Sequence, residues 1–193
     1  MRISITEKSA LVIVDVQNDF LPGGALPVPN GDLVTEPLNN YISFFKKKNL
    51  PIFATKDWHP RNHISFRDRG GPWPPHCIQH TTGAEISGKL VLPPTVRLVD
   101  KAFSPDKDAY SGFQETTLYP ELYKLGVKRL FIGGLATDYC VKATVLDSIK
   151  LEFETILLLD AIKGVSSEDS EKAIKEIILN GAIGIVLEDL IMN

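Results

Sequence analysis

The sequence predicts a single α/β domain, with a mostly parallel sheet of about six strands between helices in a three-layer arrangement. Six short segments are almost continuously apolar, which is typical of strands buried on both faces. Amphipathic segments with a helical period separate several of them, and this strand–helix–strand repetition favours a parallel sheet. The chain has 193 residues, so one domain covering residues 1–193 is the expected organisation.

The apolar segments and the periodic segments give the expected elements in chain order. The expected strands cover residues 10–16, 52–55, 97–99, 129–132, 155–159 and 182–187. The expected helices cover residues 33–48, 117–125, 137–150 and 167–180. The last helix has the clearest ends, because Ser167 begins a first turn rich in acidic residues and Gly181 follows its final residue.

Two segments interrupt this alternation. Residues 21–31 read LPGGALPVPNG and follow the first strand directly, and residues 58–94 are rich in proline and glycine without a helical period. Loops of this length inside a compact domain usually act as lids or binding loops. We therefore expect both segments to contribute to a functional site.

The composition excludes several classes of partner. The chain has 21 basic and 24 acidic residues and a formal charge of −3, so neither nucleic acid nor an anionic membrane is expected as a partner. Its apolar runs are far shorter than the roughly 20 residues of a membrane span, and its N-terminus lacks the pattern of a signal peptide. Two cysteines are too few for a disulfide scaffold. We expect a soluble, cytoplasmic protein.

Polar residues follow the predicted strands. Asp15, Asp57, Lys101 and Asp160 are expected at the ends of four strands, and the glycine-rich turn at 133–135 follows another. Any one of them could be a helix cap or a turn residue. Because ligands of an open α/β sheet bind outside the carboxyl ends of its strands, the group as a whole indicates a functional edge.

All four histidines of the chain lie in the second long loop. Asp57, His59 and His63 form the pattern D-W-H-x-x-x-H, and the loop can return His76 to the same place. Imidazole and carboxylate groups are common ligands of divalent metals, so the spacing favours a metal site over a solvated histidine-rich loop. Zn²⁺ is the first expectation, with Fe²⁺ and Mn²⁺ as alternatives. His80 and Cys77 fall outside the pattern, and Cys77 is interpreted as structural or incidental.

Cys140 lies where a predicted strand turns into a predicted helix. At such a corner, backbone N–H groups and the helix dipole would lower the pKa of a thiol and could bind an oxyanion. An isolated cysteine is more often a small buried hydrophobe. The expected proximity of Asp15 and Lys101 instead favours a nucleophile, with a carboxylate to take its proton and a cation nearby.

Five motifs together resemble the nicotinamidase/pyrazinamidase branch of the isochorismatase-like cysteine hydrolases. They are D-V-Q-N-D-F at 15–20, D-W-H at 57–59, W-P-P-H-C at 73–77, Lys101 with D-A-Y-S-G-F at 108–113, and G-G-L-A-T-D-Y-C-V at 133–141. They occur in the order of the family and span nearly the whole chain. The D-W-H and W-P-x-H motifs distinguish this branch from the isochorismatases, so the resemblance implies the isochorismatase-like hydrolase fold and a metal site.

The resemblance also implies roles for individual residues. The implied catalytic triad is Asp15, Lys101 and Cys140. The implied metal ligands are Asp57, His59 and His76, with His63 at the position of a further ligand. The implied substrate contacts are Phe20 and Trp73, which would sandwich a pyridine ring, together with Leu135, Ala136 and Tyr139. A cis peptide is implied between Leu135 and Ala136, and the N–H groups of Ala136 and Cys140 would form the oxyanion hole.

The implied reaction is the hydrolysis of nicotinamide to nicotinic acid and ammonia through a cysteine thioester, in NAD salvage, with pyrazinamide as a second substrate. A homo-oligomer is compatible with the sequence. An amidase of the same superfamily that acts on a non-pyridine amide or carbamoyl group is the main alternative. A phospho-acceptor receiver domain would be much shorter and would need neither the histidines nor Cys140. A metal-binding or redox-thiol protein would release no ammonia.

Overall fold

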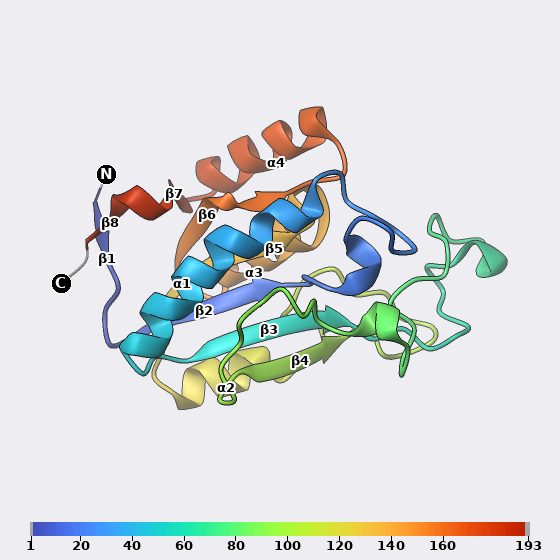
Figure 1. Ribbon diagram of the computed structural model, residues 1–193, viewed down its shortest axis with the longest axis horizontal. Helices are drawn as coiled ribbons and strands as arrows, with labels where there is room; N and C mark the ends of the chain where they lie inside the picture. Colours follow the sequence, from blue (N-terminus) through green and yellow to red (C-terminus); the bar gives the residue numbers. More distant parts are fainter. Residues whose placement is uncertain (1, 192–193) are drawn as a thin grey trace.

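A computed structural model describes residues 2–191, and its centre is a sheet of six parallel strands in the order β4-β3-β2-β5-β6-β7 (Figure 1). The strands are β2 Ser9–Val14, β3 Ile52–Asp57, β4 Arg97–Lys101, β5 Arg129–Leu135, β6 Glu154–Lys163 and β7 Ile183–Ile185. The helices are α1 Thr35–Lys47, α2 Leu118–Lys124, α3 Lys142–Lys150 and α4 Ser167–Leu179. The predicted α/β class and the parallel sheet are confirmed.

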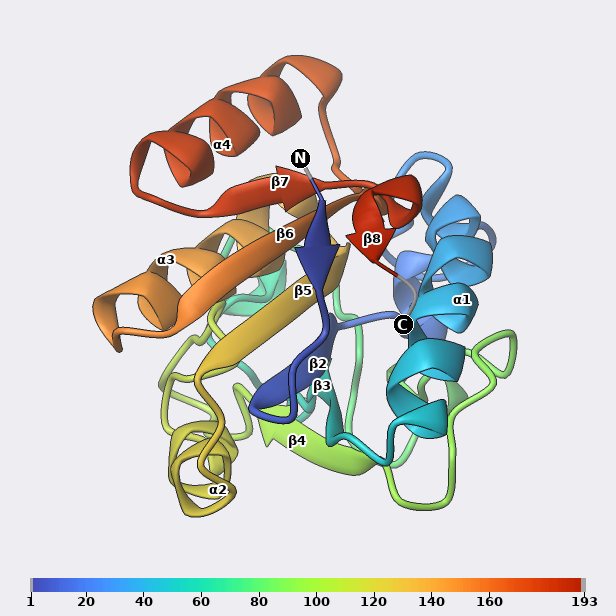
Figure 2. The same ribbon diagram turned by 90° about the vertical axis from the view of Figure 1, so that its left-hand side faces the viewer.

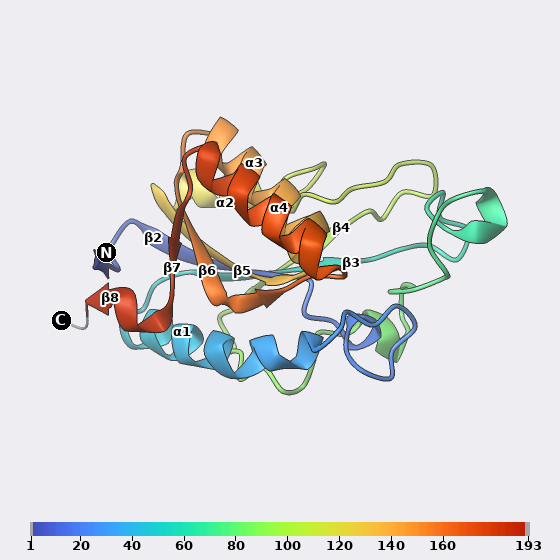
Figure 3. The same ribbon diagram turned by 90° about the horizontal axis from the view of Figure 1, so that it is seen from above.

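Helices cover both faces of the sheet. Helix α1 lies on one face, and α2, α3 and α4 lie on the other (Figures 2 and 3). Strand β2 shows why its sequence is continuously apolar: Leu11 and Ile13 belong to the core under α1, whereas Ala10 and Val12 belong to the core under the other helices. All six residues of β2 are buried, so each face of the strand contributes to a hydrophobic core.

The strand order places a crevice between β2 and β5. Strands β3 and β4 extend the sheet from β2 in one direction, and β6 and β7 extend it from β5 in the other. At such a switch point the connections leave in opposite directions, which opens a binding site at the carboxyl ends of the strands. The loop at 21–31 and the first part of the segment 58–94 lie beyond these ends, and the last part of that segment runs back along the sheet to the start of β4 (Figure 1). Within residues 2–191, none of the helices has the length and apolarity needed to cross a membrane.

The fifth expected strand, at residues 155–159, is longer in the structure than predicted. Strand β6 continues to Lys163, so the prediction that Asp160 ends it is wrong. The carboxylate of Asp160 accepts hydrogen bonds from the Tyr41 hydroxyl at 2.9 Å and from the Leu187 N–H at 3.0 Å. Asp160 therefore ties α1 and the chain after β7 to the sheet.

Two further features differ from the sequence prediction. The helix expected from residue 137 begins with one wide π-helical turn, Thr137–Val141, before α3 continues as an α-helix. Two short strands, β1 (Ile3–Ser4) and β8 (Leu190–Ile191), pair in parallel as a separate two-stranded sheet. With two residues each, they are too short to show a hydrophobic period.

Candidate active site

Asp15 begins the site at the point where β2 ends. Its backbone adopts a left-handed conformation, φ 49°, which turns the chain away from the sheet and leaves the side chain fully buried. The Thr55 hydroxyl donates a hydrogen bond to Oδ1 at 2.7 Å, and the Lys101 ammonium lies 3.0 Å from Oδ2. Burial raises the pKa of Asp15, although the Lys101 charge acts in the opposite direction. Asp15 is thus a buried carboxylate with raised basicity.

Lys101 lies at the end of β4 and is fully buried, which is rare for a lysine without charged partners. Its ammonium contacts the carboxylates of Asp15 and Asp57 and lies 3.4 Å from the Cys140 sulfur. It also donates a hydrogen bond to the Ala109 carbonyl at 3.1 Å. Burial alone would lower the pKa of Lys101, but the two carboxylates raise it well above its usual value, so the side chain is a cation.

Cys140 is presented by the turn between β5 and α3. This turn contains a cis peptide between Leu135 and Ala136, as the resemblance implies. Gly134 has φ 127°, and a Cβ there would lie 2.1 Å from the Val14 carbonyl oxygen, so the turn passes β2 at a distance that only glycine allows. The structure brings the Cys140 sulfur to Lys101 and Asp15, as its predicted place at the strand–helix corner implies.

The protonation state of Cys140 differs from the sequence prediction. The prediction that its position lowers the pKa of the thiol is wrong: burial raises the pKa well above its usual value, and the Lys101 charge offsets only part of this effect. The carboxylates of Asp15 and Asp57 raise it further. The resting group is therefore a thiol, and a nucleophilic role would require a base beside it.

Asp57, His59 and His76 form a group of possible metal ligands. Their ligand atoms all lie within 4.8 Å of one another, and all three side chains are buried. Nδ1 of His59 lies 3.0 Å from the His76 carbonyl, and Nδ1 of His76 lies 2.8 Å from the Pro74 carbonyl. A proton on each Nδ1 leaves each Nε2 with a free lone pair.

The lowered pKa values of His59 and His76 keep both imidazoles neutral, as metal ligands must be. Burial and the neighbouring His76 and His63 lower the pKa of His59 to about 2, and burial also lowers the pKa of His76. Two neutral imidazoles with a carboxylate are a donor set that suits Zn²⁺, Fe²⁺ and Mn²⁺. The residues present therefore fit a divalent metal.

His63 lies beside this group with both ring nitrogens engaged. Its ring centroid is 4.3 Å from that of His59. Nδ1 lies 2.7 Å from the Ser65 hydroxyl and Nε2 lies 3.0 Å from the Lys107 carbonyl. Its possible ligand atoms come together with those of His59 and Asp108, rather than with those of Asp57 and His76. The assignment of His63 as a ligand of the same metal stays a prediction.

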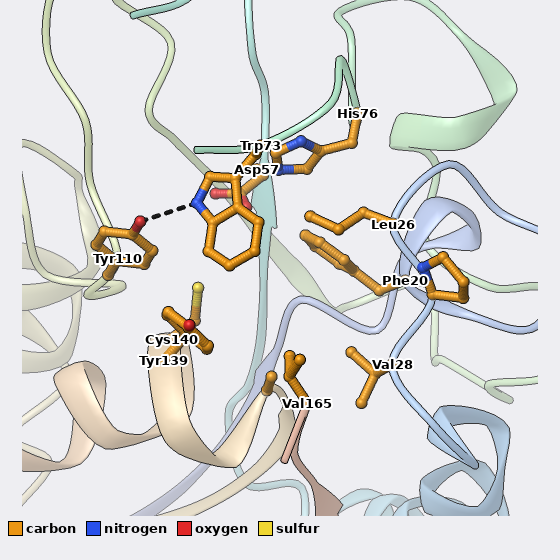
Figure 4. A pocket seen from close by; sticks show the side chains of 12 residues that line it. Phe20, Leu26, Val28, Asp57, Trp73, His76, Tyr110, Tyr139, Cys140 and Val165 are labelled. Atoms are coloured by element: carbon orange, nitrogen blue, oxygen red, sulfur yellow. Dashed lines mark hydrogen bonds between the residues drawn. The ribbon is translucent and has the colours of Figure 1, made fainter. Parts of the chain in front are cut away.

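A small cavity of about 60 Å³ connects the Cys140 thiol with the group of possible metal ligands (Figure 4). Cys140 contributes to its wall, and so do Asp57 and His76. The remaining wall is almost entirely apolar or aromatic and consists of Phe20, Leu26, Pro27, Val28, Trp73, Tyr110, Ala136, Tyr139 and Val165. A molecule in this cavity would therefore lie against the thiol and the possible metal ligands at the same time.

Some wall residues could not be predicted. Tyr110 accepts a hydrogen bond from the Trp73 indole N–H at 3.0 Å, and the Tyr139 ring packs edge-on against Trp73 (Figure 4). Tyr110 lies within the D-A-Y-S-G-F motif, but nothing in its spacing indicates a partner 37 residues away. The side chain of Leu135, a predicted substrate contact, is fully buried in the hydrophobic core and is absent from the cavity wall.

Known proteins resemble the chain over most of its length. The isochorismatase domain matches residues 9–189. The chain is 36% identical to the nicotinamidase of Escherichia coli (strain K12), over 93% of this chain and 95% of that protein.

Two solved structures have the same fold. The pyrazinamidase of Pyrococcus horikoshii in complex with zinc is 52% identical, with a TM-score of 0.91 over 93% of this chain and 99% of that one. PnC1 from L. infantum in complex with nicotinate is 32% identical, with a TM-score of 0.93 over the whole of both chains. The resemblance carried by the five motifs is therefore confirmed, and the chain belongs to the isochorismatase family.

Proposed function

We propose that this protein is a metal-dependent cysteine amidohydrolase that converts nicotinamide to nicotinic acid and ammonia, and pyrazinamide to pyrazinoic acid. One observation carries the proposal: a single small apolar cavity is bounded by the Cys140 thiol and by the possible metal ligands Asp57 and His76. The apolar and aromatic lining suits a flat ring with a carboxamide, because one end of the ring must react while the ring itself is held. The similar proteins named nicotinamidase and pyrazinamidase support this substrate class. With nicotinic acid as its product, the enzyme would act in NAD salvage.

Asp57, His59 and His76 would hold the metal, and Zn²⁺ is the favoured ion because a zinc complex of a similar pyrazinamidase is known. When bound, the metal supplies a Lewis acid for the ring nitrogen of the substrate, which orients the ring. Phe20 and Trp73 contribute two flat apolar surfaces to the same cavity and would bind the faces of the pyridine.

Acylation begins with transfer of the Cys140 proton to Asp15. The sulfur then attacks the carboxamide carbon, and the N–H groups of Ala136 and Cys140 stabilise the oxyanion. The raised pKa of Asp15 makes it a stronger base than an exposed aspartate, and its proximity to the thiol provides the route for the proton. Protonated Asp15 returns the proton to the leaving nitrogen, so ammonia departs and a thioester remains.

Deacylation reverses the roles of the same groups. Asp15 takes a proton from a water molecule, the resulting hydroxide attacks the thioester carbon, and the sulfur leaves with the proton from Asp15. Lys101 stays charged throughout. Its ammonium, 3.0 Å from Asp15 and 3.4 Å from the sulfur, stabilises the negative charge that moves between these two groups.

The direct test is ammonia release from nicotinamide by the purified zinc-loaded protein, with benzamide as the matched substrate that lacks the ring nitrogen. We expect rapid turnover of nicotinamide and little turnover of benzamide. Equal rates would keep the cysteine amidase but would contradict the role of the metal in holding the ring. Absence of ammonia from nicotinamide and pyrazinamide would contradict the proposed function.

A His59→Ala substitution tests the metal centre. We expect zinc affinity to fall and KM for nicotinamide to rise by at least about tenfold, because the ring nitrogen loses its anchor. His80→Ala is the matched control, since His80 lies in the same loop but packs against Trp58. Steady-state kinetics at fixed free zinc should show an unchanged KM for the control. An unchanged KM in His59→Ala would remove the metal from substrate binding.

A further inference from the structure

The segment that follows Asp15 carries two polar side chains that the proposed reaction does not use. Gln17 and Asp19 lie two and four residues after Asp15, on either side of the start of a short 3-10 turn, Asn18–Phe20. Neither side chain belongs to the group of possible metal ligands, and neither lines the catalytic cavity. Each nevertheless binds the main chain at, or next to, one of those ligands.

Gln17 holds the main chain of Asp57. Its side-chain carbonyl accepts the Asp57 N–H at 2.8 Å, and its amide group donates to the Asp57 carbonyl at 2.8 Å and to the Ala84 carbonyl at 3.0 Å. The pairing of β2 with β3 ends at Val14 and Thr55, so Asp57 has no backbone partner on that side. The fully buried Gln17 amide takes the place of the missing strand and fixes the point from which the Asp57 carboxylate projects.

Asp19 holds the main chain next to His76. Its Oδ2 accepts the Cys77 N–H at 2.7 Å, and its Oδ1 accepts the Ala25 N–H at 3.1 Å. Cys77 has φ 46°, a conformation that a residue with a side chain rarely adopts, so this turn needs external support.

Two further features fix the same turn. The Cys77 carbonyl accepts the His59 N–H at 3.0 Å, which links the turn to a second possible ligand. A Cβ at Gly83 would lie 2.2 Å from Asp19 Oδ2, so Gly83 leaves the space that the carboxylate occupies.

We propose that Gln17 and Asp19 are positioning residues for the metal centre, and that they set the spacing of Asp57, His59 and His76 from the end of β2. The inference rests on the proposed function, because it assigns the three residues to one metal. The same short segment then fixes the position of Asp15, the proposed base, relative to the proposed metal ligands. Residues that orient ligands from outside the coordination shell typically change metal affinity by about 10- to 100-fold when they are replaced.

The test is the zinc dissociation constant of the metal-free full-length protein, measured by competition with a chromogenic chelator. Asp19→Asn keeps the size of the side chain but can accept only one of the two N–H groups. Gln17→Glu keeps an acceptor for the Asp57 N–H but loses both donated bonds. Asn18→Ala is the control, since Asn18 lies between the two and its side chain donates to the Thr82 carbonyl, not to the main chain of a proposed ligand or its neighbour.

We expect Asp19→Asn and Gln17→Glu to weaken zinc binding by about tenfold or more, while Asn18→Ala binds like the wild type. Raising free zinc should restore kcat in Asp19→Asn, which a general loss of structure would not allow. Wild-type affinity in a folded Asp19→Asn protein would overturn the proposal for Asp19, and the same result in Gln17→Glu would overturn it for Gln17. Failure of the wild type itself to bind zinc would overturn the metal centre as well.

Discussion

Replacement of Cys140 by alanine should abolish ammonia release from nicotinamide, with a loss in kcat on the order of 10⁴- to 10⁶-fold. The side chain supplies the only sulfur beside Asp15 and Lys101 in the described site, and alanine cannot form the thioester. Zinc and nicotinamide should still bind, because the possible metal ligands and the apolar wall are unchanged. A stopped-assay ammonia measurement, together with equilibrium binding of nicotinamide, separates the two effects.

Cys77→Ala is the matched control for this experiment. Cys77 is the second free cysteine of the chain, is fully buried in the hydrophobic core, and is not among the residues that line the cavity, so its thiol has no substrate to attack. The control should keep a kcat close to that of the wild type. Rapid quenching of the wild type with substrate should trap one nicotinoyl group on Cys140, visible by mass spectrometry. Substantial turnover by Cys140→Ala would refute the assignment of the nucleophile.

Replacement of Lys101 by methionine should lower the free energy of unfolding of the metal-free protein by about 3–5 kcal/mol. Methionine fills much of the same volume, but it leaves the buried carboxylates of Asp15 and Asp57 facing one another without a cation. The same change should reduce kcat sharply, because no positive charge then stabilises the sulfur anion. Urea unfolding followed by circular dichroism measures the first effect, and ammonia release measures the second.

Arg97→Met provides the comparison on the same strand. Arg97 forms an ion pair with Glu121 at 3.0 Å, but both side chains are partly exposed to solvent. Loss of such a pair should change the free energy of unfolding by about 1 kcal/mol or less. If both substitutions lowered the free energy of unfolding equally, burial of the ion pairs of Lys101 with Asp15 and Asp57 would not determine how much they stabilise the protein.

The grouping of polar residues at one edge of the sheet could be predicted from the sequence, because it follows from a simple rule. Asp15, Asp57 and Lys101 each come at the end of an apolar run, and parallel strands bring such ends together. Asp160 follows an apolar run in the same way, yet β6 continues past it. An apolar pattern marks where a strand is buried, but strand pairing decides where it ends.

The contacts that hold the site together could not be predicted. Gln17 reaches Asp57 across 40 residues, Asp19 reaches Cys77 across 58, and Trp73 reaches Tyr110 across 37. Each of these bonds involves a side chain from outside the β-strands and α-helices, where no periodicity fixes its direction. The raised pKa of Cys140 could not be predicted either. It is caused mainly by burial, and the degree of burial depends on how the loops close over the turn.

The pairing of β1 with β8 has a practical consequence for measurements on surfaces. Ile3 lies opposite Leu190 in this small sheet, which is at the end of the molecule remote from the long loops (Figure 1). A tether fused before β1 or after β8 would therefore leave from the same pole, and the loops around the candidate active site would point into solution. Immobilised protein should then exchange small molecules freely, which makes either fusion suitable for a biosensor.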